Sequence, residues 1–319
     1  MTLYYIAHRL FAAHDRALGA YVAHRLASRT GADAVFLPFC DTGEEDLVAE
    51  CKGWRLFELD SARLRRTDGM LALLHGPSLD DGLCMEIGFA VALRIPVVAF
   101  TTDFQSYGPA ADGPASPFPD PLLEVLTTKI VRSHRLGPAR LGNAADRFEV
   151  FLDQNLQSLA GATDLAIDAL LDAQPSNTPV LGQATAAQRL AYIEPSPYFA
   201  DGLWHDVAGY LRSEGWKVYV ATRLRACGKP REAARADWDA LTRASLALVD
   251  VCGPETPPGA ALVIGACVAT KRPVLAADPG GWWTFADGRE PNWRNLMIQY
   301  AVTGRFASVG ELAAFTAPR

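Results

Sequence analysis

The residues best suited to chemistry gather in one stretch of the chain, residues 75–90, where Asp80 and Glu86 stand close together. An apolar run, residues 70–74, precedes this stretch, and a second apolar run, residues 96–100, follows it. The pattern predicts a strand, an acidic loop, a helix that begins at Glu86, and a second strand, which together form a βαβ unit of a parallel sheet. Ligands of such sheets bind beyond the carboxyl ends of the strands, so Asp80 and Glu86 are expected to border a ligand-binding crevice.

Glu86 also has a purely structural explanation. A carboxylate in the first turn of a helix is favoured by the positive end of the helix dipole, whatever the function of the protein. The spacing of the acids alone does not separate the two explanations, and the choice between them depends on matching residues elsewhere in the chain.

The rest of the first half supplies the elements that position this stretch. Apolar runs predict strands, and helical spacing predicts the segments between them. A segment rich in Pro, Ser, Asn and Thr, residues 174–187, is the best candidate for a linker. The predicted strands are residues 3–7, 34–38, 70–74, 96–100 and 129–132.

After the linker the pattern starts again. The order and spacing of the matches favour an internal duplication over two unrelated α/β segments of similar strand composition. We therefore predict an α/β fold of two tandem flavodoxin-like, doubly wound, parallel-sheet units, residues 1–175 and 188–319, that form a pseudo-dimer. The matches are Tyr192-Ile193 with Tyr5-Ile6, Gly253-Pro254 with Gly76-Pro77, and Ile264-Gly265 with Ile87-Gly88.

The two halves are not chemically equivalent. When they are aligned on the Ile-Gly pair, Val263 stands in the place of Glu86, and Pro257 stands in the place of Asp80. Valine offers no nucleophile and proline no proton, so the second half cannot perform the same chemistry alone.

Composition and charge exclude several classes of function. A chain of 319 residues suits two α/β domains, its net charge is −6, and it has no block of Lys or Arg that would follow the phosphates of a nucleic acid polymer. No apolar run reaches the length of a membrane span, and the first residues already resemble a strand, so no signal peptide is expected. The six cysteines lack the spacing of a metal site, which favours reduced thiols and a cytoplasmic protein.

The motif of the central stretch resembles that of a known enzyme family. Asp-x-Gly-x-x-x-Glu-x-Gly-x-Ala, residues 80–90, preceded by Asp60, is similar to the motif of the nucleoside 2-deoxyribosyltransferases. These enzymes cleave the N-glycosidic bond of a nucleoside through a covalent sugar on a glutamate, so the resemblance implies that Glu86 is the nucleophile. It covers residues 3–105 strongly and residues 190–300 weakly.

The resemblance also implies roles for other side chains. Tyr5 would orient the carboxylate of Glu86 by a hydrogen bond, although an ordinary core tyrosine also fits this position. Asp60 would donate a proton to the leaving base, although an aspartate at the start of a helix is also a common N-cap. Asp80 and Asn295 would hold sugar hydroxyls.

Asn295 suggests a composite site within one chain. In the family, an asparagine of one subunit, often in an Asn-Leu-Met-Ile run, reaches the sugar in the site of a neighbouring subunit. Residues 295–298 have this sequence, whereas the corresponding part of the first half, residues 119–123, has no asparagine. We therefore predict that the second half packs on the first as a pseudo-twofold partner and completes its site.

The chain departs from the family at His8 and Arg9, where a small Gly-Pro pair is common. A cation beside the sugar would suit a 5′-phosphate, as in the related nucleotide N-glycoside hydrolases, although a lone arginine after a strand is often only a solvated residue. The sequence has no dinucleotide or P-loop fingerprint, and neither a cofactor nor a metal is expected.

The sequence therefore predicts an enzyme that cleaves the N-glycosidic bond of a (deoxy)nucleoside through a glycosyl-glutamate and transfers the sugar to another nucleobase or to water. A 5′-nucleotide N-glycoside hydrolase that releases the free base is the alternative among enzymes. A nucleoside-binding protein without turnover is the alternative from another class. The expected partners are a nucleoside or nucleotide and an acceptor base, and a homo-oligomer of the chain is compatible with these expectations.

Overall fold

The structure is a computed structural model of the chain. Most of the predicted linker, residues 174–187, lies outside the residues that it describes, so the boundary between the two predicted domains stays a prediction. The described residues are 2–41, 43, 50–108, 113–133, 146–175, 179, 181, 189–198, 202–226, 228–278, 280, 283–285 and 289–316.

The first unit is a five-stranded parallel sheet in the order β2-β1-β3-β4-β5. Its strands are β1 (Tyr4–Ala7), β2 (Val35–Phe36), β3 (Gly69–Leu73), β4 (Val97–Thr101) and β5 (Lys129–Arg132). Its helices are α1 (Ala13–Thr30), the short 3-10 helix η1 (Ala32–Ala34), α2 (Lys52–Leu64), α3 (Asp81–Ala92), α4 (Pro121–Leu126) and α5 (Arg147–Leu171).

The second unit has a parallel sheet of the same size, in the order β10-β9-β8-β6-β7, which repeats the connectivity of the first. Two parallel, doubly wound units in tandem confirm the predicted fold class. The strands are β6 (Leu190–Glu194), β7 (Lys217–Val220), β8 (Leu246–Asp250), β9 (Val274–Ala277) and β10 (Gly304–Phe306). The helices are α6 (Gly202–Ser213), α7 (Pro230–Arg243), α8 (Pro258–Ala269), α9 (Leu296–Ala301) and α10 (Val309–Thr316).

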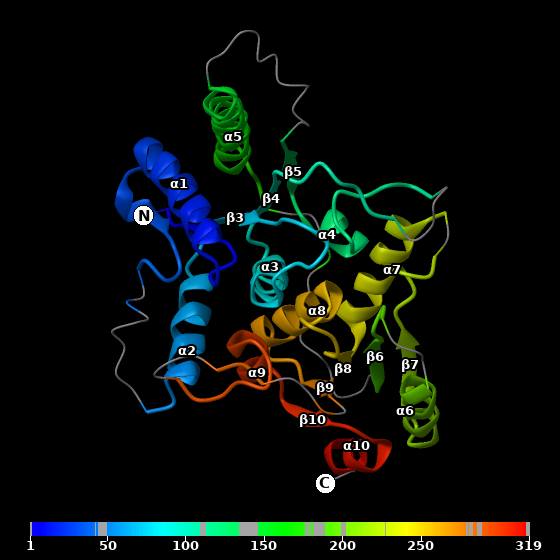
Figure 1. Cartoon of the computed structure of the whole chain (residues 1–319). Helices are drawn as coiled ribbons and strands as arrows, with labels where there is room; N and C mark the ends of the chain where they lie inside the picture. Colours follow the sequence, from blue (N-terminus) through cyan, green and yellow to red (C-terminus); the bar gives the residue numbers. More distant parts are fainter. Residues whose placement is uncertain are drawn as a thin grey trace.

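Each sheet has an outer face with its own small core and an inner face that meets the other unit. Alternate strand residues face opposite sides of a sheet, so Ile6 packs toward α1 and α5, whereas its neighbour Tyr5 packs toward α3. In the second unit, Ile193 belongs to the outer core beneath α6 and α10. Figure 1 shows α1 and α5 at one end of the molecule and α6 and α10 at the other, with α3 and α8 between them.

Helices α3 and α8 pack against each other in the core that the inner faces of the two sheets share. All residues of α3 are buried, as expected of a helix that is apolar on every side. A Cβ atom at Gly88 would lie 2.0 Å from the backbone oxygen of Leu262, and one at Gly265 would lie 1.9 Å from the backbone oxygen of Met85. The two helices therefore touch backbone to backbone at a symmetric pair of glycines.

The structure corrects two predicted helix starts. Helix α3 begins at Asp81 with Asp80 as its N-cap, so Glu86 lies in the second turn and not at the positive end of the helix dipole. Helix α2 begins at Lys52, so Asp60 lies inside the helix and is not its N-cap. Helix starts are hard to locate where aspartate and glycine, both weak helix formers, occupy the first turn, as they do in α3.

The glycine contact gives a prediction about stability. We expect Gly88→Ala and Gly265→Ala each to lower the free energy of unfolding by about 1–3 kcal/mol or more, because the added methyl group meets backbone that can yield only by moving a helix. Chemical denaturation measures the change. Gly161→Ala in α5, where nothing lies within 4 Å of the added Cβ, is the control and should not destabilise the chain. Equal stability of all three variants contradicts the close approach.

Candidate functional site

Glu86 and Tyr5 form a buried hydrogen-bonded pair between α3 and β1. The hydroxyl of Tyr5 donates to Oε1 of Glu86 at 2.7 Å. Tyr5 has no exposed surface, and its ring packs on that of Phe36 with 5.2 Å between the centroids. A hydrogen bond from a phenol to a carboxylate holds the carboxylate side chain in place. Tyr5 is therefore a core tyrosine whose hydroxyl is satisfied by the carboxylate that it was predicted to orient.

Asp80 ends the loop after β3 and caps α3. Its Oδ1 accepts a hydrogen bond from the backbone N–H of Leu83 at 2.8 Å. Burial, followed by repulsion from the neighbouring Asp81, raises the pKa of Asp80 from 3.8 to about 7. A protonated carboxyl group can donate as well as accept a hydrogen bond, which suits contact with a hydroxyl. The site therefore contains one carboxylate held by a tyrosine and one carboxyl group that keeps its proton near neutral pH.

One cavity brings together most of the predicted site residues. It lies at the carboxyl ends of β1 and β3, where a parallel sheet of this kind binds its ligands. Residues of both units line its wall, so the second unit lies beside the predicted site residues of the first. The predicted residues that line the cavity are His8, Asp60, Asp80, Glu86 and Asn295.

Asn295 reaches this cavity from the N-terminus of α9 in the second unit. Its Oδ1 caps α9 by accepting a hydrogen bond from the backbone N–H of Met297 at 2.9 Å. Its side chain also lies against the first turn of α3, because a Cβ atom at Gly82 would be only 2.8 Å from the Nδ2 atom. Gly82 thus makes room for the amide of Asn295 beside the acids of the first unit.

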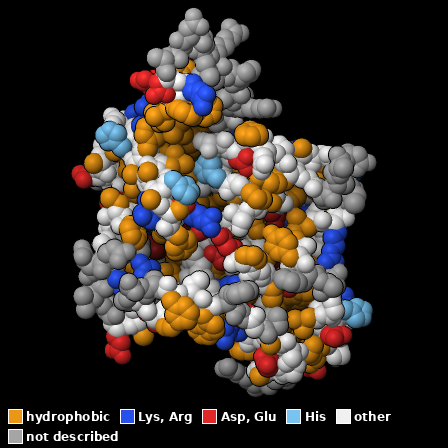
Figure 2. Space-filling model, in the orientation of Figure 1, with side chains coloured by type: hydrophobic (Ala, Val, Ile, Leu, Met, Phe, Trp, Pro, Cys, Tyr) orange, Lys and Arg blue, Asp and Glu red, His pale blue; other side chains and the backbone are white. Residues whose placement is uncertain are grey.

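A second cavity of about 200 Å³ adjoins the first and shares Asp80 with it. Its wall includes His8, His14 and His75 together with Arg9. Burial lowers the pKa of both His8 and His75, so their imidazoles are neutral at neutral pH. Figure 2 shows histidine, basic and acidic side chains gathered near the middle of one face of the molecule.

Arg9 lies in this second cavity and pairs with the other unit. Its Nη2 is 2.5 Å from Oε1 of Glu255, which belongs to the loop between β8 and α8. The side chain of Arg9 is 42% exposed, so the pair is open to solvent on one side. Arg9 is therefore more than a solvated residue, and any phosphate in this cavity would share Arg9 with Glu255.

Part of the chain matches the model of a known protein family. The family model described as nucleoside 2-deoxyribosyltransferase matches residues 4–154, which include β1, α3 and the predicted nucleophile. The match covers 151 of the 319 residues, so the likeness to this family concerns the first unit.

One solved structure, that of a conserved protein from Enterococcus faecalis V583, resembles part of the chain. The two are 32% identical, and the match covers 33% of this chain and 65% of that one, with a TM-score of 0.29. This chain thus spans less than two thirds of that protein, and a TM-score this low does not establish a shared fold. No curated protein matches.

Three further features of the described residues concern metal ligands, membrane-spanning helices and a buried cysteine. Among these residues no group of three His, Cys, Asp or Glu side chains is arranged to hold a metal ion. Within the same part of the chain, no helix is both long and apolar enough to cross a membrane. Cys84 of α3 is fully buried, and burial raises the pKa of its thiol well above the usual value.

The sequence did not indicate the roles of three residues near the two cavities. Gly82 lies inside the recognised motif, but nothing local indicates that its missing side chain leaves space for Asn295. Arg289 lines the cavity, and Glu255 pairs with Arg9, yet both come from loops of the second unit that carry no motif. Only the packing of the two units brings them to the site.

The buried carboxyl of Asp80 gives a prediction about pH. Because its pKa is higher in the folded chain than in the unfolded chain, its contribution to stability is present at low pH and is lost as the pH rises toward about 7. Between about pH 5 and about pH 8, we expect this effect to lower the free energy of unfolding of the wild type by on the order of 3 kcal/mol. The Asp80→Asn variant should not show this decrease. Asparagine still caps the helix, so the fold is retained. Parallel pH profiles for the two proteins would rule out a raised pKa at Asp80.

Proposed function

We propose that the chain cleaves the N-glycosidic bond of a nucleoside through a covalent sugar on Glu86 and passes the sugar to another nucleobase or to water. The observation that carries this proposal is the buried Tyr5–Glu86 pair, set in a cavity that Asn295 of the second unit helps to enclose. A carboxylate fixed in this way is suited to attack an anomeric carbon.

In the proposed first step, an oxygen of Glu86 forms a bond to the anomeric carbon while the bond from that carbon to the base nitrogen breaks. The electron pair of the broken bond goes to the base, and Asp60 supplies the proton that the base then carries. Asp80 and Asn295 hold the sugar hydroxyls during the transfer. In the second step, the acceptor loses a proton to Asp60 and displaces Glu86 from the sugar.

We also infer that residues 188–319 are a degenerate copy of the transferase domain. The two units have the same strand connectivity, and each has a basic residue with positive φ directly after its central helix region, Arg94 at 64° and Lys271 at 57°. Thr128 and Thr303 accept equivalent hydrogen bonds from the first residues of β4 and β9, both at 3.1 Å. Such matched details support duplication of one unit, with loss of the nucleophile in the second.

A 5′-nucleotide N-glycoside hydrolase is the second candidate, and the cavity beside Asp80 favours it. Three histidines and Arg9 border this space, and neutral imidazoles can donate hydrogen bonds to phosphate oxygens. The cavity adjoins the one proposed for the sugar, so it is placed to receive a group attached to the sugar. A nucleoside-binding protein without turnover would not need the Tyr5–Glu86 pair. Release of free base, which both enzymes would show, distinguishes them from such a protein.

The proposed roles of Glu86 and Tyr5 are tested with one variant of each residue, and each variant has a matched control in the second unit. Glu86→Gln should lower the rate of glycosidic cleavage by about 10³-fold or more, because the covalent step loses its attacking group. Tyr5→Phe should lower it by roughly 10- to 100-fold, the effect of losing a hydrogen bond to a charged group. Release of free base from a panel of nucleosides and deoxynucleosides, with and without an acceptor base, measures both.

The controls for this experiment come from the second unit. Val263→Ala changes the residue aligned with Glu86, and Tyr192→Phe removes the hydroxyl aligned with that of Tyr5, and neither should alter the rate of the folded enzyme. A Glu86→Gln variant that keeps more than about a tenth of the wild-type rate would exclude a covalent Glu86.

The choice between nucleoside and nucleotide is tested at Arg9. If Arg9 binds a 5′-phosphate, monophosphates should be better substrates than nucleosides by about 10-fold or more, and Arg9→Ala should abolish this preference. Glu255→Gln removes the competing carboxylate, so it should strengthen the preference. The ratio of kcat/KM values for the two substrates is the measurement, and a ratio near one in the wild type assigns Arg9 to the inter-unit ion pair alone.

A further inference from the structure

The second unit contains a counterpart of the candidate site. In the strand register, Tyr5 pairs with Met70 in the first sheet, and Tyr192 pairs with Ala247 in the second. Tyr192 is therefore in the position of Tyr5, and its hydroxyl also donates to a buried carboxylate, Oε2 of Glu194, at 2.7 Å. The counterpart site retains a tyrosine–carboxylate pair although its central helix has lost the acid.

The two units also exchange residues in the same way. Asp120 of the first unit caps α4 by accepting a hydrogen bond from the backbone N–H of Leu122 at 2.8 Å, just as Asn295 caps α9. Asn295 lies against Gly82 of α3, and Asp120 lies against Gly259 of α8, with Oδ2 only 2.5 Å from the position of an added Cβ. Each unit thus places the N-cap of a short helix at the start of the other unit's central helix.

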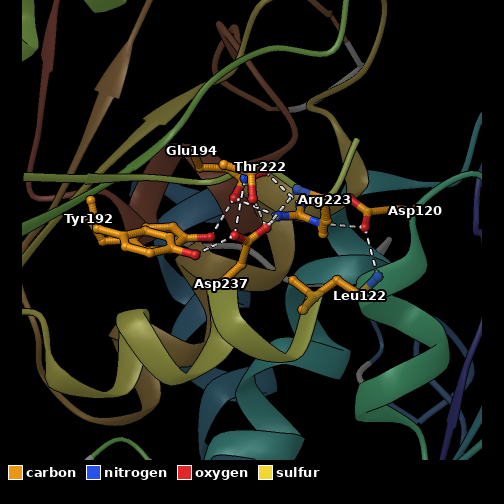
Figure 3. Close-up of polar contacts among 8 residues, drawn as sticks. Asp120, Leu122, Tyr192, Glu194, Thr222, Arg223 and Asp237 are labelled. Atoms are coloured by element: carbon orange, nitrogen blue, oxygen red, sulfur yellow. Dashed lines mark hydrogen bonds and ion pairs between the residues drawn. The ribbon is translucent and has the colours of Figure 1, made fainter. Parts of the chain in front are cut away.

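The counterpart site differs from the first in one respect, because an arginine fills it. An added Cβ at Gly259 would lie only 1.8 Å from Nη2 of Arg223, whose side chain is 1% exposed. Figure 3 shows the guanidinium of Arg223 between Asp120, Glu194 and Asp237. The group occupies the space beside the helix start that remains a cavity in the first unit.

Arg223 is held by all three carboxylates. Its Nε and Nη2 each lie 2.7 Å from an oxygen of Asp120, and its Nη1 and Nη2 lie 3.0 and 2.7 Å from the two oxygens of Glu194. Nη1 also lies 3.3 Å from Asp237. Burial alone would lower the pKa of Arg223, but the charges of Asp120 and Glu194 outweigh burial and raise it well above the usual value.

We propose that Arg223 is a built-in occupant of the second unit's counterpart of the active site, held there as a bound cation would be. Of these two equivalent places, the one in the first unit is open to an external ligand. The closed one joins the units, because Asp120 comes from the first unit and the other acids from the second. This proposal does not depend on what reaction the open site performs.

The proposal is tested by removing the occupant and supplying a free one. Arg223→Ala leaves three carboxylates without their cation, so its melting temperature should fall well below that of the wild type. Low-millimolar guanidinium or methylguanidinium chloride should raise the melting temperature of this variant by about 3 °C or more, because a ligand that binds only the folded state stabilises it. A cavity of about 70 Å³ against Arg223 and Glu194 gives the solute a route to the vacated place.

The controls separate filling of the site from a general effect of salt. The wild type and Arg231→Ala should show no such gain, since the side chain of Arg231 is 48% exposed and pairs with Glu124 of α4 outside the three-carboxylate cluster. Sodium chloride at the same concentration should have no effect on any of the proteins. Equal responses of Arg223→Ala and Arg231→Ala to guanidinium overturn the proposal.

A second variant covers the case in which Arg223→Ala does not fold. Arg223→Ala/Glu194→Gln removes one carboxylate with the cation, so the excess of negative charge in the cluster is the same as in the wild type. This protein should bind guanidinium with a saturable rise in melting temperature. The proposal is also overturned if neither variant responds to guanidinium. This holds whether the variants fold on their own or are recovered in the presence of guanidinium.

Discussion

The backbone contact between α3 and α8 at Gly88 and Gly265 determines how the two units lie against each other. Side chains at a helix crossing can repack, but two backbones in contact leave no layer of side chains to adjust, and protein interiors transmit such constraints without yielding. Each central helix follows the central strand of its own sheet, so the crossing also fixes where the N-terminal turns of α3 and α8 lie. The relative positions of Asp80, Glu86 and Asn295 therefore depend on a pair of glycines that line neither of the two cavities.

The approximate twofold arrangement of the units explains why one short-helix cap serves each central helix. Asn295 and Asp120 perform the same local task, but their side chains differ in what they offer beyond it. The amide of Asn295 uses its oxygen for the cap and keeps N–H donors for the cavity, which suits neutral hydroxyls. The carboxylate of Asp120 only accepts hydrogen bonds, so its free oxygens need a cation, and Arg223 supplies one.

The sequence was sufficient to predict the class of the fold, because strand composition and the repeated Ile-Gly and Gly-Pro pairs are local signals. It was also sufficient to name Tyr5, Asp60, Asp80 and Glu86, which stand in one recognisable half and which the structure gathers at one end of the first sheet. It misplaced the starts of α2 and α3, whose first turns contain the weak helix formers Gly53 in α2 and Asp81 and Gly82 in α3.

What the sequence could not give is the set of contacts between residues distant in the chain. The pairing of Arg9 with Glu255 joins positions 246 residues apart, and that of Arg223 with Asp120 joins positions 103 apart. Neither partner of these pairs belongs to a motif that specifies the other. Such contacts depend on the crossing of α3 and α8, and nothing in the sequence indicates that the glycines of these two helices meet.

The two units also show different solutions to the cost of burying acids. An isolated buried carboxylate is strongly unfavourable, so it must keep its proton, receive hydrogen bonds or face a cation. In the first unit Asp80 keeps its proton until about pH 7 and Glu86 receives the hydroxyl of Tyr5, and neither arrangement fills the adjoining cavity. In the second unit a cation is used instead, and a guanidinium large enough to meet three acids also fills the space between them. Val263, at the position aligned with Glu86, would by itself leave that place open, whereas the buried Arg223 both pairs with the acids there and closes it.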